Sequence, residues 1–114
     1  MEIKNYYVIP GLPQFHPTPE RIIEATCAEY CVHYDSVKMR SRKRYVTLPR
    51  KAIIHLLRTM TNLGWREIAK KAGYGKDHSS AIHANNTLIC YMSVYPDVRS
   101  KIERIKERIK NELQ

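Results

Sequence analysis

The chain has 114 residues, a hydrophobic content of 43% and a formal net charge of +9. This length fits one domain rather than two, and the apolar content supports a packed core and excludes global disorder. No apolar run approaches the roughly 20 residues that span a bilayer, so a membrane-spanning protein is excluded. The charge favours an anionic partner, with nucleic acid ahead of a membrane surface or an acidic protein.

The N-terminal segment is predicted to be an arm rather than part of the folded domain. Prolines at positions 10, 13 and 17 forbid a helix through residues 1–17, which leaves residues 18–114 for the domain. Residues 1–13 lack the basic head and apolar stretch of an export signal. The cysteine count is odd, which indicates reduced thiols in a cytoplasmic protein; the three are Cys27, Cys31 and Cys90.

Helix signals follow one another along the rest of the chain. Thr18 and Pro19 suit the N-cap and first position of a helix, which the apolar spacing extends to about residue 34. A short second helix is expected near residues 37–39, capped by Asp35 and Ser36. Leu48 and Pro49 open a third helix. That helix ends at residues 62–64, and a fourth covers residues 65–72.

Two further helices complete the predicted bundle. Gly73-Tyr74-Gly75 forms a tight connection because glycine tolerates positive φ, and Asp77 caps the fifth helix. The last helix runs from about residue 97 to 113. Its apolar positions recur at a spacing of 3–4, which fits packing on the domain better than a seam between two chains. These positions are Val98, Ile102, Ile105, Ile109 and Leu113.

Charge is strongly segregated between Asp35 and Glu67. This stretch has nine basic residues and no acidic one, and it leads into two short helices joined by glycines. A basic run is often only a solvated face, but this arrangement favours contact with nucleic-acid phosphates. The nine are Lys38, Arg40, Arg42, Lys43, Arg44, Arg50, Lys51, Arg58 and Arg66.

The fourth and fifth helices have the pattern of a helix-turn-helix. A short helix, a glycine-containing turn and a second helix that begins with small polar residues define this motif. The start of the second helix must read base edges, and lysine, aspartate and serine side chains all hydrogen-bond to bases in the major groove. The expected base-reading residues are Lys76, Asp77, His78, Ser79 and Ser80.

Residues 76–84, Lys-Asp-His-Ser-Ser-Ala-Ile-His-Ala, resemble the signature Gly-Arg-Asp-His-Thr-Thr-Val-(Leu/Ile)-His-Ala of the C-terminal DNA-binding domain of DnaA, the bacterial replication initiator. The upstream pattern Arg42-x-Arg44-x-x-x-x-Pro49-Arg50 is similar to that family's basic loop and the Pro-Arg that follows it. The resemblance covers roughly residues 20–110. It implies an all-α bundle of five or six helices, Trp-repressor-like in its helix-turn-helix.

The resemblance also implies roles for individual residues. Arg44 matches the basic-loop arginine that enters the minor groove, while Arg42 and Lys43 share its loop at residues 40–44. Arg50 and Arg58 match basic positions that contact the DNA backbone, and Lys51 beside them is expected to contact a phosphate as well. The major groove is expected to receive Asp77, His78, Ser79 and Ser80 from the recognition helix, with Lys76 before them. His83 is expected to be structural.

Five departures from the family pattern leave the bound sequence open. Lys76 stands where the family has arginine, so a bidentate fork becomes a point charge. Ser79 and Ser80 replace threonines and lack the methyl group that contacts thymine. Leu48 replaces a basic residue, and the glycine turn is one residue longer than usual.

No Gly-x-x-x-x-Gly-Lys-(Ser/Thr) phosphate loop occurs in the sequence. We therefore expect a stand-alone DnaA-like protein without the ATPase module, which binds double-stranded DNA and is not an enzyme. No cofactor is expected. The replication initiator itself and a second copy of the chain are further candidate partners. Two alternatives stay open: a transcription repressor of the same fold, and an interaction module for an acidic partner or the initiator.

Other single-residue interpretations are weaker. His78 and His83 are five residues apart, whereas metal-binding helical histidines stand at i and i+4, so no metal site is expected. Cys27 and Cys31 are interpreted as buried thiols on an apolar face. Trp65 is interpreted as a core anchor rather than a base-stacking residue, and Tyr74 either packs or contacts a phosphate.

Overall fold

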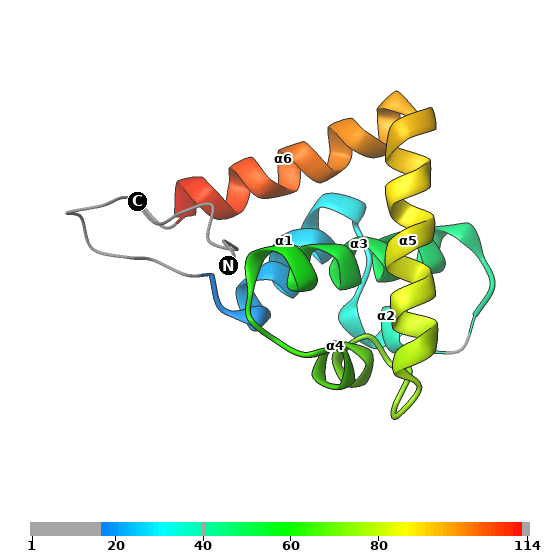
Figure 1. Cartoon of the computed structure of the whole chain (residues 1–114). Helices are drawn as coiled ribbons and strands as arrows, with labels where there is room; N and C mark the ends of the chain where they lie inside the picture. The colour runs from blue at the N-terminus through cyan, green and yellow to red at the C-terminus, as the bar shows by residue number, and fades with distance from the viewer. Residues whose placement is uncertain (1–16, 40, 113–114) are drawn as a thin grey trace.

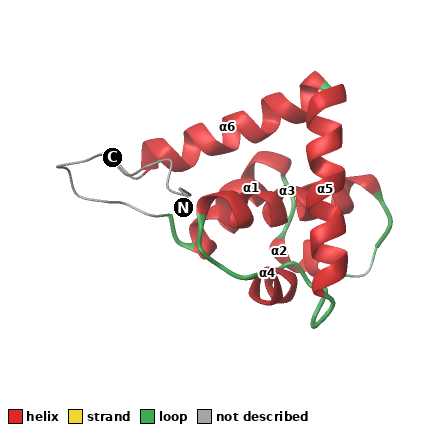
Figure 2. Cartoon of the chain, in the orientation of Figure 1, coloured by secondary structure: helices red, strands yellow, loops and turns green. Residues whose placement is uncertain are grey.

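The computed structural model describes residues 17–39 and 41–112, and these ranges contain six α-helices and no strand (Figures 1 and 2). The predicted all-α bundle is therefore confirmed. Its division into an arm and a domain stays a prediction, because residues 1–16 lie outside the described ranges. The helices are α1 (Pro19–Tyr30), α2 (Tyr34–Lys38), α3 (Arg44–Met60), α4 (Trp65–Lys71), α5 (His78–Val94) and α6 (Pro96–Glu112).

Helix α1 begins as predicted and ends earlier than predicted. The Thr18 side chain accepts a hydrogen bond from the backbone N–H of Arg21 at 3.2 Å, with Pro19 in the first turn. The helix stops at Tyr30 because Cys31 adopts a left-handed conformation with φ of 56°. This turn leaves Cys31 exposed, so its interpretation as a buried thiol is wrong, whereas Cys27 is buried.

Two helix starts differ from the sequence prediction. The short α2 begins at Tyr34, with His33 rather than Asp35 or Ser36 at its N-cap. Helix α3 begins at Arg44, so Pro49 lies inside the helix instead of opening it. Pro49 is tolerated because it is near the N-terminus, where its missing N–H removes a single hydrogen bond, the one to the Tyr45 carbonyl.

The later helices follow the predicted limits within about one residue. Asp77 caps α5 as predicted, and α6 follows α5 after Tyr95 alone. On α5, the apolar side chain of Ile89 is 47% exposed and lies outside the core. Leu113 lies outside the described residues. The apolar residues of α6 pack within the chain: Val98, Ile102, Ile105 and Ile109 are all buried. They are therefore not free to form a coiled-coil contact with a second copy.

Helix α3 is the centre of the bundle. It packs against α1, α2, α4 and α5, while α6 turns back from the end of α5 and lies across α1 (Figure 1). Within the described ranges, none of the helices has the length and apolarity that crossing a membrane requires. The largest fully buried side chains come from all the helices: Ile22, Val37, Ile53, Ile54, Leu56, Leu57, Ile68, Leu88, Val98, Ile102, Ile105 and Ile109.

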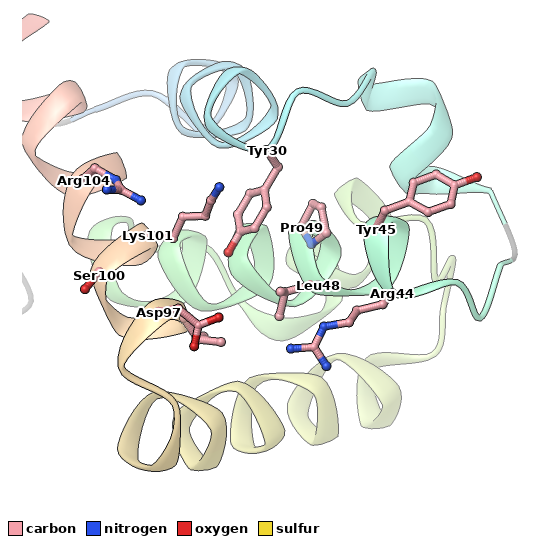
Figure 3. A pocket seen from close by; sticks show the side chains of 10 residues that line it. Tyr30, Arg44, Tyr45, Leu48, Pro49, Asp97, Ser100, Lys101 and Arg104 are labelled. Atoms are coloured by element: carbon pink, nitrogen blue, oxygen red, sulfur yellow. The ribbon is translucent and has the colours of Figure 1, made fainter.

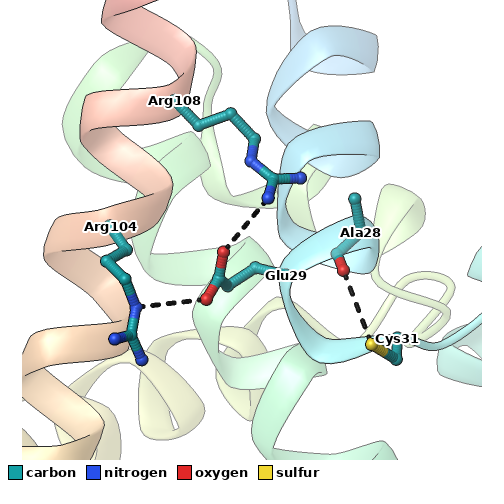
Figure 4. A network of polar contacts seen from close by, with 5 residues as sticks. All are labelled: Ala28, Glu29, Cys31, Arg104 and Arg108. Carbon is teal, nitrogen blue, oxygen red and sulfur yellow. Dashed lines mark hydrogen bonds and ion pairs between the residues drawn. The ribbon is translucent and has the colours of Figure 1, made fainter.

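A two-armed ion pair joins α1 to α6. The Glu29 carboxylate forms ion pairs with two arginines of α6 (Figure 4). Its Oε2 lies 3.2 Å from Nε of Arg104, and its Oε1 lies 3.4 Å from Nη2 of Arg108. The Glu29 side chain is only 14% exposed, whereas the two arginines are more open to solvent. Because Glu29 is partly shielded from water and salt, the pair fixes the crossing of the two helices more firmly than a surface pair would.

One buried polar contact connects the central helix to α5. Nδ1 of His55 lies 2.9 Å from Oδ1 of Asn85, and both residues are buried. Since the Asn85 oxygen only accepts, His55 donates from Nδ1. Burial lowers the pKa of His55 below its ordinary 6.5, although the Asn85 hydrogen bond acts in the opposite direction.

The burial of His55 predicts a loss of stability in acid. As the pH falls below about 6.5, the unfolded chain protonates His55 before the folded chain does, so the free energy of unfolding decreases. Denaturant melts at several pH values between 7 and 5 measure the slope. His55→Gln should flatten this part of the curve, while His33→Gln, a change at an exposed histidine, should keep the wild-type slope. An unchanged slope in His55→Gln would contradict the assignment.

Candidate nucleic-acid interface

Helices α4 and α5 form the predicted helix-turn-helix. Residues 72–77 connect them, and within this segment Gly73 has φ of 92° and Gly75 has φ of 63°. These positive φ values are the reason for the two glycines. The turn is also docked on α2: a Cβ on Gly73 would lie 2.6 Å from the carbonyl oxygen of Lys38. The absence of a side chain therefore lets the turn approach the end of α2.

Asp77 closes the N-terminus of α5. Its Oδ1 accepts the backbone N–H of Ser80 at 3.1 Å, and its Oδ2 accepts the Ser80 hydroxyl at 2.6 Å. These two hydrogen bonds lower the pKa of the Asp77 carboxyl, which keeps it ionised. Both oxygens already have partners, so any base reading by Asp77 has to share a carboxylate that caps the helix.

One open pocket lies between α5, the predicted recognition helix, and the central helix α3. Lys51 of α3 faces α5 there, and Tyr74 of the turn completes the wall. Burial first, then the charges of Arg50 and Arg44, lowers the pKa of Lys51. The α5 residues that line the pocket are Ser79, Ser80, His83, Ala84, Thr87 and Tyr91.

His83, for which a structural role is expected, does not pack in the core. It is exposed and lies in this pocket, one turn beyond Ser79 on the same face of α5. Thr87 follows one turn later, and its hydroxyl donates to the His83 carbonyl at 2.9 Å. The i, i+4, i+8 spacing of Ser79, His83 and Thr87 is the sequence signal that could have placed all three on one polar face.

The basic stretch lies partly in the segment between α2 and α3 and partly in α3 itself. Arg42 and Lys43 are exposed in the segment before α3, whereas Arg44 is exposed on the first turn of that helix rather than in a loop. Arg40 lies outside the described residues. Lys76 and His78 are exposed at the other end of the site, at the start of α5.

Arg50 is a correction to the predicted set of phosphate contacts. It is only 7% exposed, and its Nε donates to the Val37 carbonyl at 2.8 Å while Nη2 donates to the Met39 carbonyl. Its guanidinium also lies 5.7 Å from the centre of the Tyr74 ring. Arg50 therefore holds the chain between α2 and α3 against the turn of the helix-turn-helix, and it is not placed to contact a phosphate.

Arg58 and Trp65 form a second cation–aromatic contact. The Arg58 guanidinium lies 4.6 Å from the centre of the Trp65 ring, at the start of α4. Trp65 is half-buried and packs against the core, in agreement with its interpretation as an anchor. Tyr74 is half-buried and packs there too. No group of three His, Cys, Asp or Glu side chains in the described ranges is arranged to hold a metal ion.

The fold and the site define a helix-turn-helix protein with basic residues flanking its second helix. The family model for the bacterial DnaA protein helix-turn-helix matches residues 19–88. The chain therefore belongs to this family, as the signature at residues 76–84 indicated.

The relatives of the chain are also DnaA proteins. It is 32% identical over 92 residues to the chromosomal replication initiator protein DnaA of Methylacidiphilum infernorum, a match that covers 81% of this chain and 20% of that protein. The DnaA of Chlorobaculum tepidum is also 32% identical over 92 residues, with 81% and 18% covered. The chain spans about a fifth of the length of these relatives.

The two turn glycines predict unequal costs of substitution. Gly73→Ala should destabilise the fold by about 2–4 kcal/mol, because a Cβ there meets the Lys38 backbone and the positive φ adds strain. Gly75→Ala meets no atom within 4 Å and should lose only about 1 kcal/mol from its φ. Chemical denaturation measures both. Equal losses would show that the turn does not depend on its contact with α2.

Proposed function

We propose that the chain binds double-stranded DNA sequence-specifically, with the N-terminus of α5 in the major groove. The observation that carries this proposal is the convergence of Lys51 with Ser79, Ser80 and His83 around one pocket of the family's helix-turn-helix. Lys76, His78 and Ser79 are exposed at the start of α5, where base-reading side chains belong. Hydroxyl, imidazole and ammonium groups can all hydrogen-bond to base edges.

The flanking basic residues supply the phosphate and minor-groove contacts in this proposal. Arg44 projects from the start of α3 as the minor-groove residue, and Arg42 and Lys43 precede it on the exposed connection. Lys51 contacts a phosphate beside α5, and Arg58 contributes to the positive field. Such contacts fix the register of a protein on the duplex without reading its sequence.

The cellular role that we propose is replication initiation or its regulation in the bacterial cytoplasm. The relatives are replication initiators by name, and the protein would bind DNA without catalysing a reaction. Lys76, Ser79 and Ser80 differ from the family signature, which favours a repressor with a different site as the second candidate.

Fluorescence anisotropy tests the proposal most directly. We expect a duplex that carries a DnaA box to bind about 100-fold more tightly than a scrambled duplex of equal length, with affinity falling steeply as salt rises. Equal, salt-sensitive binding would favour the second candidate, whose site random-sequence selection would then identify. No binding to either duplex would refute DNA binding by this fold.

Two substitutions separate the proposed contacts. Lys51→Ala should weaken all duplexes alike and lower the slope of log affinity against log salt by about one, whereas Lys110→Ala, an exposed change late in α6, should leave the slope unchanged. Asp77→Ala should reduce discrimination between duplexes. Asp77→Asn keeps a capping oxygen, so recovered specificity would show that Asp77 acts as a cap alone, and persistent loss would show that its carboxylate reads a base.

A further inference from the structure

A second pocket lies where α1, the start of α3 and the start of α6 meet (Figure 3). Its walls combine apolar groups with charged ones. Leu48, Pro49 and Val98 supply the apolar surface, and Tyr30 enters from α1. Arg44 is the only lining residue that also belongs to the predicted DNA contacts.

The hydroxyl of Tyr30 is a buried donor without an acceptor. It is the one such side-chain atom found in the part of the chain that the structure describes. Burial, followed by the charges of Glu29 and Asp97, raises the pKa of Tyr30 to about 12, so the hydroxyl keeps its proton at neutral pH. An unpaired buried hydroxyl costs free energy, and a bound acceptor would remove this cost.

The charges around Tyr30 specify the kind of acceptor. Nζ of Lys101 lies 5.3 Å from the centre of the Tyr30 ring, and Arg44 extends toward the same space from α3 (Figure 3). Arg104 also lines the pocket, although its Nε is paired with Glu29. Against these three cations stand two anions, Asp97 in the pocket wall and Glu29, whose charge also reaches Tyr30. The pocket therefore favours a negatively charged oxygen.

The apolar walls favour a protein segment over a nucleic-acid backbone. Tyr45 on the rim is 62% exposed, and exposed aromatics beside arginines are typical of protein interfaces. The α6 side of the pocket also agrees with this choice, because it lies far from the recognition end of α5. Asp97 and Val98 line the pocket and come just after the C-terminal end of α5. Since α5 has 17 residues, this end lies about 25 Å from the recognition end of the helix.

We propose that this pocket binds an acidic protein segment, in which a carboxylate accepts from the Tyr30 hydroxyl beside Lys101 and an apolar side chain packs on Leu48 and Val98. Because the hydroxyl is covered in the free chain, binding requires the side chains that cover it to move aside. The proposal does not depend on DNA binding, since it uses α1, the start of α3 and α6 rather than the helix-turn-helix.

The test titrates the full chain with the peptide acetyl-Glu-Glu-Leu-Glu-Glu-amide, followed by amide chemical shifts in NMR spectra. We expect saturable shifts centred on the pocket and none with the matched peptide acetyl-Gln-Gln-Leu-Gln-Gln-amide. Tyr30→Phe and Lys101→Gln should each weaken binding about tenfold. Tyr30→Phe should leave the melting temperature unchanged or raise it, because it removes an unpaired buried hydroxyl.

Two control variants and one competing ligand make the test decisive. Lys110→Gln removes a charge from the same helix outside the pocket, and Tyr95→Phe removes a hydroxyl elsewhere; both should bind as the wild type does. No peptide binding, or equal weakening by Lys110→Gln, would overturn the proposal. It would also be overturned if the peptide failed to bind while Tyr30→Phe and Lys101→Gln reduced affinity for a long duplex, since the pocket would then be a DNA contact.

Discussion

The guanidinium of Arg50 is the junction on which the arrangement of the site depends. It donates to the Val37 and Met39 carbonyls and lies over the ring of Tyr74, so it joins the end of α2, the central helix and the turn before α5. A buried charge of this kind is tolerated because two of its nitrogens donate to carbonyls and the cation lies near an aromatic ring. Gly73 adds a second contact at the same place, where the turn meets the backbone of Lys38. The basic residues before α3 and the recognition helix are thereby held in one fixed relation.

Local signals in the sequence predicted the parts of the fold that depend on near neighbours. The caps at Thr18 and Asp77 each satisfy a backbone N–H three residues along the chain, and the glycine turn depends on its own φ values. The apolar spacing of α6 likewise predicted a buried stripe. Such features follow from periodicity and hydrogen bonding within a few residues. The family signature added the motif of α4 and α5, which these signals alone only suggested.

Features that depend on distant parts of the chain could not be predicted in this way. Pro49 has the sequence signal of a helix start, yet α3 begins five residues before it, at Arg44. Arg50 has the composition of a phosphate contact, yet the carbonyls that bury it come from residues 11 and 13 positions away. Tyr30 gave no signal at all, because its unpaired hydroxyl exists only where α1, α3 and α6 meet. The sequence shows where basic residues occur but does not show which of them are buried in the folded chain.

The neighbours Arg50 and Lys51 show how a helix assigns opposite roles to similar side chains. One residue along an α-helix turns the side chain by about 100°, so Arg50 points into the α2 junction while Lys51 faces the α5 pocket. Arg44 and Leu48 precede Lys51 by seven and three residues and share its side of α3, where they line the pocket near α6. One face of the central helix thus borders both candidate sites, and Arg50, on the adjacent side of the same helix, holds the turn before α5 in place. The substitution of a family basic residue by Leu48 then has a physical consequence: it makes the face between the two sites apolar, which suits a protein segment better than a phosphate.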